Sequence, residues 1–189
     1  MKLIAIVFLV GCAERIGPPA SESPDASMLD DDAIVQTGPV RTTSNPDGSS
    51  TSIVDASSSD VWTHVDIAAF SATDAEGPWA LRFQRFHISA AHGTEVAPVA
   101  APFDSVTTAP STGWVRDEDL DGNGDPDFAF EQGDGWFDYN ADTHVLTPKP
   151  LTWVVRSPTT TLKLKFENYY DSAGTAGLFT LTWRHLSWK

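Results

Sequence analysis

The chain has 189 residues and a formal net charge of −14, with 26 acidic and 12 basic side chains. This balance excludes nucleic-acid binding, which needs clustered Lys and Arg to replace counterions. The single cysteine, Cys12, lies near the N-terminus, so thiol catalysis and cysteine-bound zinc are excluded for the rest of the chain.

The N-terminal segment has the pattern of a lipoprotein signal peptide. One lysine precedes the apolar run LIAIVFLV, and Gly11 and Cys12 follow it. The run is too short to span a bilayer as a helix, which needs about 20 apolar residues. Its end, LVGC, resembles the lipobox of bacterial lipoproteins, in which the cysteine is acylated. We therefore expect residues 1–11 to be cleaved and Cys12 to anchor the protein by lipid to the outer membrane, at its periplasmic face or at the cell surface.

Composition divides the remaining chain into two parts. Residues 12–60 are rich in Ser, Asp, Thr, Pro and Gly and contain no aromatic side chain. Such a segment buries too little apolar surface to offset the entropy of ordering, which predicts a disordered acidic linker. Residues 61–189 hold every aromatic residue except Phe8, and their length suits one folded domain.

Two segments near the C-terminus alternate between apolar and polar residues, as strands do. In Thr161–Phe166 (TLKLKF), the apolar residues face one way, while Lys163 and Lys165 face solvent. Leu178–Leu186 (LFTLTWRHL) alternates in the same way. The polar, glycine-containing stretch between them predicts a hairpin with a long loop.

Further strands are expected upstream, at Val61–Phe70, Trp136–Tyr139 and Leu151–Arg156. Trp79–Ile88 (WALRFQRFHI) changes its apolar face midway, which indicates a strand with a bulge or one buried on both faces. No segment shows a sustained helical stripe. The predicted fold class is therefore mainly β, a single antiparallel domain with long loops.

The acidic loop DEDLDGNGDPD, residues 117–127, has the spacing of a calcium-binding loop. Its candidate ligands are Asp119, Asp121, Asn123 and Asp127, with glycines that allow a tight turn. Calcium prefers six to eight oxygen ligands, and carboxylates at alternate positions can converge on one ion. The run resembles the short calcium loops of β-propeller repeats and part of an EF-hand loop, but lacks the terminal Glu of an EF-hand. The alternative is a solvated acidic turn without an ion.

Several motifs of the second half are similar to those of the HmuY-like haem-binding lipoproteins. They are DGWFDYNADTHVLTPKPLTWVVRS, LKLKFENYYDSAGTAGLFTLTW and WALRFQRFHI, the last followed by the polar loop AAHGTE. The resemblance covers most of residues 61–189. It implies an antiparallel β fold and a surface lipoprotein that captures haem and passes it to an outer-membrane receptor. The founding member of the family is understood to hold the haem iron between two histidines.

Five histidines are available to bind haem iron, for which imidazole is a suitable ligand. His64, His87 and His185 lie in predicted strands, where a histidine satisfied by a hydrogen bond at the edge of the core is expected. His92 and His144 lie in predicted loops, and loops on a rigid scaffold commonly carry ligands. The candidate haem ligands are therefore His92 and His144.

Alternative functions remain open at this point. A calcium-stabilised β module could bind glycans through exposed tryptophans, or bind a partner protein, without haem. The chain has no HExxH, GxSxG or P-loop motif, and its paired carboxylates lie among glycines rather than in an apolar site. We therefore expect a binding protein and not an enzyme.

Overall fold

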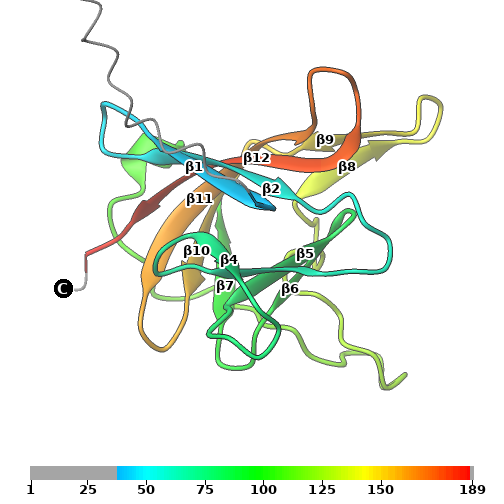
Figure 1. The fold of residues 1–189 in the computed structure, drawn as a ribbon. Helices are drawn as coiled ribbons and strands as arrows, with labels where there is room; N and C mark the ends of the chain where they lie inside the picture. The colour runs from blue at the N-terminus through cyan, green and yellow to red at the C-terminus, as the bar shows by residue number, and fades with distance from the viewer. Residues whose placement is uncertain (1–37, 188–189) are drawn as a thin grey trace, which may run out of the picture. The chain divides into compact units, whose positions relative to one another are not determined.

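A computed structural model of the chain describes residues 38–187, in which the strands form three antiparallel sheets (Figure 1). The larger sheet has the order β1-β2-β12-β11-β10-β7, the second sheet β4-β3-β5-β6, and β8 pairs with β9. The strands are β1 (Val40–Ser44), β2 (Ser50–Asp55), β3 (Thr63–Asp66), β4 (Ser71–Thr73), β5 (Leu81–Gln84), β6 (His87–Ala90), β7 (Glu95–Val99), β8 (Phe137–Asn140), β9 (Val145–Pro148), β10 (Thr152–Arg156), β11 (Thr161–Tyr170) and β12 (Ala176–His185).

The predicted fold class is confirmed, because every named strand pairs antiparallel and the only helical segment in the described range is the short 3₁₀ turn η1 (Phe103–Ser105). The hairpin of β11 and β12 is confirmed as well. Its loop is shorter than expected, since Tyr170 pairs with Ala176 and the aromatic end of β11 continues the strand. No helix within residues 38–187 is long and apolar enough to cross a membrane.

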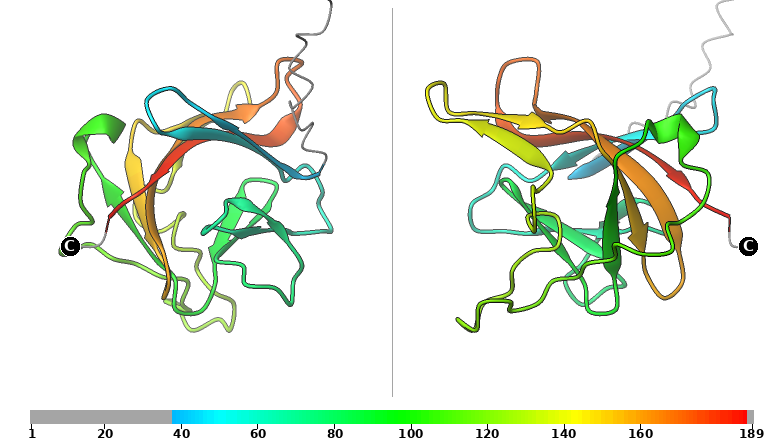
Figure 2. Two further views of the ribbon diagram at one scale, coloured as in Figure 1. Left: turned by 60° about the vertical axis from the view of Figure 1, so that its left-hand side comes forward. Right: turned by 180° about the vertical axis from the view of Figure 1, so that it is seen from behind.

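The core lies between the six-stranded and the four-stranded sheet, which face one another in Figure 2. Aromatic rings join the two sheets. Phe83 of β5 meets Phe179 of β12 edge-on at 5.2 Å, and Phe70 stacks on Trp183 at 4.7 Å. Such ring pairs contribute roughly 0.5–1.5 kcal/mol beyond the area that they bury.

The predicted linker is wrong over residues 40–55, which form β1 and β2. β2 pairs with β12 from Ser50↔Trp183 to Asp55↔Leu178, so this hairpin completes the larger sheet. Val54 is fully buried, and Ser52 accepts a hydrogen bond from the Trp183 indole at 2.8 Å. The polar composition concealed the hairpin, because most of its other side chains are exposed or half-exposed.

The predicted single strand at Trp79–Ile88 is also wrong. β5 and β6 form a tight hairpin in which Gln84 pairs with His87. Arg85 takes a positive φ of 52°, and its backbone N–H donates to the Ala56 carbonyl at 2.7 Å. The change of apolar face in the sequence therefore marks a turn and not a bulge.

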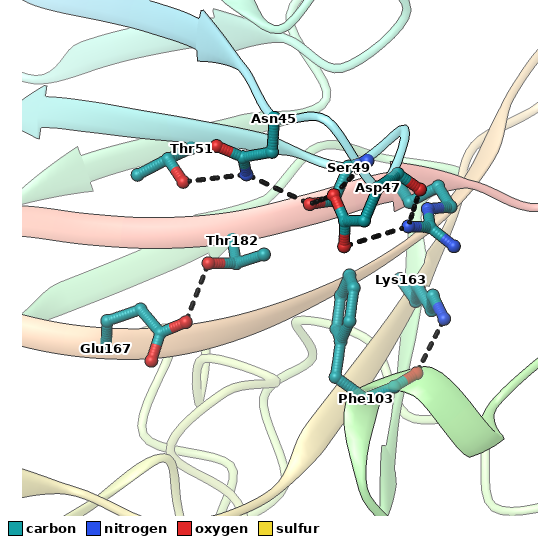
Figure 3. A network of polar contacts seen from close by, with 9 residues as sticks. Asn45, Asp47, Ser49, Thr51, Phe103, Lys163, Glu167 and Thr182 are labelled. Carbon is teal, nitrogen blue, oxygen red and sulfur yellow. Dashed lines mark hydrogen bonds and ion pairs between the residues drawn. The ribbon is translucent and has the colours of Figure 1, made fainter.

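The outer face of β11 is only partly solvated, contrary to the alternation argument. Lys163 is 2% exposed because η1 covers it, and its amine donates to the Phe103 carbonyl at 2.5 Å (Figure 3). Burial lowers the pKa of Lys163. The ammonium also lies 4.2 Å from the centre of the Phe103 ring, which provides a cation–π contact.

The N-terminal hairpin adds further polar contacts on this face. Asp47 in its turn forms an ion pair with Arg184 of β12 at 3.1 Å, and Asn45 donates to Ser49 and Thr51 (Figure 3). These contacts join the turn between β1 and β2 to the strand that β2 pairs with.

We predict that residues 61–187 fold only when the N-terminal hairpin of β1 and β2 is present. A chain beginning at residue 61 exposes the edge of β12 and loses the buried Val40 and Val54. Burying each valine contributes about 1.5–3 kcal/mol, and net stability is only about 5–15 kcal/mol. Thermal unfolding followed by circular dichroism should show a cooperative transition for a chain beginning at residue 38 and none for the shorter one. Equal transitions would contradict this role.

Candidate functional site

In the β8–β9 hairpin, the side chains of Tyr139 and His144 meet across the turn. The Asn140 side chain accepts hydrogen bonds from the N–H groups of Asp142 and Thr143, at 2.9 and 3.0 Å. His144 takes a positive φ of 56°, in the left-handed region that His adopts more readily than most residues. In this turn, Tyr139 Oη and His144 Nδ1 lie 2.5 Å apart.

Trp136, directly before β8, fixes the base of this hairpin. It is fully buried, and its indole N–H donates to the Phe86 carbonyl at 3.1 Å. The Lys149 N–H donates to the Trp136 carbonyl at 2.9 Å. Phe137 of β8 thereby lies beside Phe86, in the turn between β5 and β6, with ring centres 5.9 Å apart.

An apolar pocket of about 500 Å³ opens next to the hairpin, on the side where β9 packs against β11. Figure 2 shows the hairpin extending beside the β11–β12 loop. The pocket is lined by Phe86, Phe137, Tyr139, His144, Leu146, Tyr169, Tyr170 and Ala176. Its volume and mainly aromatic lining are typical of sites for small organic ligands.

Three tyrosines and one histidine supply the polar side-chain atoms of this pocket. Tyr170 Oη accepts a hydrogen bond from the Leu146 N–H at 2.9 Å. Tyr169 is 3% exposed, and burial raises the pKa of its phenol, which keeps it neutral. Tyr139 is 54% exposed, so it and His144 are the accessible ligating groups.

Two of the three strand histidines, His87 and His185, have polar partners at hydrogen-bond distance, as expected. His87 Nδ1 lies 2.9 Å from Glu131, and burial raises the pKa of that carboxyl. His185 Nε2 lies 3.1 Å from the Ile67 carbonyl. His64 packs edge-on against Trp79 at 5.2 Å, and burial is the main cause that lowers the pKa of His64.

His92, the second predicted haem ligand, lies in a different pocket. This pocket of about 430 Å³ is polar and shares no lining residue with the aromatic one. Beside His92 it contains Glu95, Arg116 and Asp117. Asp117 accepts the N–H groups of Ala90 and Ala129, and burial raises the pKa of its carboxyl. The structure therefore does not bring His92 and His144 together around one ligand.

A third pocket, of about 530 Å³, is lined by Trp153, Leu120 and Gln132 among others. It contains neither a histidine nor a tyrosine. It is therefore a less suitable place for a ligand that requires an imidazole or a phenol.

The acidic loop brings three of its four predicted calcium ligands together. One oxygen from each of Asp119, Asp121 and Asp127 lies within 4.8 Å of the others. The Asn123 Oδ1 accepts the N–H of Asp125 at 2.7 Å. Asp119 and Asp127 also accept backbone N–H groups of the loop, so hydrogen bonds within the loop already support the turn.

Sequence reasoning missed Tyr139 as a partner of His144. A signal was present, because the two residues flank a short polar turn between two predicted strands. The deciding feature is the left-handed conformation of His144, which strand periodicity does not reveal.

Comparison with known proteins identifies the fold. No protein-family model matches the chain, and no curated protein matches its sequence. A Bacteroides vulgatus protein designated as HmuY-like and haem-binding matches in structure with a TM-score of 0.58 and 17% identity, covering 71% of this chain and 90% of that chain. The chain has the HmuY-like fold.

Two further solved structures are similar to the chain in fold. The HmuY analogue of Tannerella forsythia, solved in its apo form, has a TM-score of 0.60 at 12% identity, over 79% of this chain and 97% of that chain. A Bacteroides fragilis protein designated as a lipoprotein has a TM-score of 0.61 at 18% identity, over 78% and 95%. At these identities the likeness establishes the fold, and the ligand must be argued from the side chains.

Proposed function

We propose that this chain is a non-enzymatic lipoprotein of the HmuY-like family that binds haem or a related porphyrin for iron acquisition. The observation that carries the proposal is the aromatic pocket with His144 and Tyr139 at its accessible edge. The fold likeness adds support, since one protein of that fold is designated as haem-binding.

The residues present fit a porphyrin. Flat aromatic walls such as Phe86 and Phe137 suit an apolar macrocycle, and both histidine and tyrosine are known axial ligands of haem iron. Of the two predicted ligands, the proposal retains His144. His92 faces a separate polar pocket and provides a matched control.

The membrane anchor is also part of the proposal. Cys12 and residues 1–11 lie outside the described residues, and the lipobox pattern is the support for a lipid anchor on Cys12. A neighbour in fold is designated as a lipoprotein, which agrees with this assignment. We propose attachment to the outer membrane and transfer of haem to a receptor there.

The haem proposal predicts a change in the visible spectrum when hemin is added to residues 38–189. The Soret band should shift and saturate at one equivalent. Replacing His144→Ala should weaken binding by about tenfold or more, as loss of a ligand or of its supporting partner does. His92→Ala should bind as the wild type does. A shift that is lost in His92→Ala and retained in His144→Ala would contradict the choice of pocket.

A second proposal concerns calcium, favoured by the convergence of Asp119, Asp121 and Asp127. Bound calcium would stabilise the loop without taking part in ligand capture. Binding of glycans through exposed tryptophans is not supported by a comparable observation in residues 38–187. The tryptophans of the described part are buried or half-buried, and Arg82 lies against the rings of Trp62 and Trp79 at 4.5 and 5.2 Å.

The calcium proposal predicts a higher melting temperature in calcium than in EDTA. Calcium at a hundred times its dissociation constant stabilises a folded protein by about 2.7 kcal/mol. Asp121→Asn should remove the difference. Asp125→Asn should retain it, because Asp125 lies outside the cluster. An identical melting temperature with calcium and with EDTA would contradict the proposal.

A further inference from the structure

Tyr139 and His144 line the aromatic pocket and are also in direct contact with each other. Oη of Tyr139 and Nδ1 of His144 are 2.5 Å apart, and both side chains line the aromatic pocket. One nitrogen of the imidazole is therefore already used by the phenol. Phenols hold their proton at neutral pH and need a base or a metal to lose it. A histidine at hydrogen-bond distance is such a base.

We infer that the phenolate oxygen of Tyr139 is the iron ligand for ferric porphyrin, with His144 accepting its proton at Nδ1. The O–H bond of Tyr139 breaks, the proton stays on the His144 imidazole, and the phenolate oxygen forms a bond to ferric iron. No electron is transferred. This inference rests on the proposed function and names the ligand atom and oxidation state that the site selects.

The other candidates in the pocket are less suitable. The Tyr170 hydroxyl already accepts the N–H of Leu146, and Tyr169 is buried with its pKa raised by burial. His87, next to Phe86, is paired with Glu131. Tyr139, with 54% of its surface exposed, is the phenol that an entering porphyrin can reach.

The remaining lining residues, Phe86, Phe137, Leu146 and Ala176, have no side-chain atom that ligates iron. Tyr139 would therefore be the one residue of the pocket lining that binds the iron through oxygen. An anionic oxygen favours ferric over ferrous iron, so reduction should loosen the complex. His144 acts as a positioning residue that holds and deprotonates the phenol.

The test uses the full-length chain, ferric protoporphyrin and metal-free protoporphyrin. The resonance Raman spectrum of the ferric complex should contain phenolate vibrations that shift when tyrosine is ring-deuterated. Tyr139→Phe should abolish these vibrations and weaken ferric binding by more than about tenfold, while metal-free porphyrin binds as before. His144→Gln should weaken ferric binding and reduce the vibrations. Dithionite should lower affinity in the wild type and have little effect on Tyr139→Phe.

Three outcomes would overturn the inference or its basis. If Tyr139→Phe keeps the wild-type ferric affinity and spectrum while His144→Gln loses them, His144 is the ligand and the inference is wrong. If metal-free porphyrin binds and the ferric complex lacks phenolate vibrations, the pocket stands and the ligand assignment fails. If neither porphyrin binds, the proposed function itself fails.

Discussion

The burial of Trp136 is the constraint on which the candidate site depends. Its ring packs against Phe166 of β11 and Phe179 of β12 in the larger sheet, and its indole N–H donates to the carbonyl of Phe86 in the turn between β5 and β6. Because β8 begins at the next residue, this anchoring sets where Phe137 and Tyr139 emerge. The pocket is therefore formed where a short, exposed hairpin is held against a packed core, an arrangement common for ligand-binding loops on rigid scaffolds.

The larger sheet could be predicted only in part from the sequence. β11 and β12 bury alternate side chains, so their period-two pattern is visible. β1 and β2 carry mostly Ser and Thr and bury few apolar side chains, so their composition is that of a linker. The sequence contains the turn signal Asn45-Pro46-Asp47-Gly48. That turn joins two strands only because β2 pairs with the distant strand β12, which the local sequence does not reveal. Lys163 illustrates the same limit, since a distant segment, η1, covers it.

The site shows the same division between local and long-range information. His144 was predicted because it lies in a loop, and that placement is right. His92 was predicted on the same ground and lies in another pocket, since loop position does not specify which loops adjoin. The pairing of Tyr139 with His144 depends on one left-handed residue, and the wall at Phe86 depends on a turn between β5 and β6 that was predicted as one strand. The convergence of Asp119, Asp121 and Asp127 was predictable because it is local in sequence.

The most direct test of the account is the location of a bound porphyrin, measured by methyl NMR with diamagnetic zinc protoporphyrin. Ring currents shift methyl resonances that lie close to a macrocycle. The account predicts large shifts for Leu146 and Ala176, which line the aromatic pocket, and small ones for Ala90 and Ala91 of the His92 pocket. Large shifts at Ala90 and Ala91, or at Leu120 and Ala129 of the third pocket, with Leu146 and Ala176 unmoved, would contradict it.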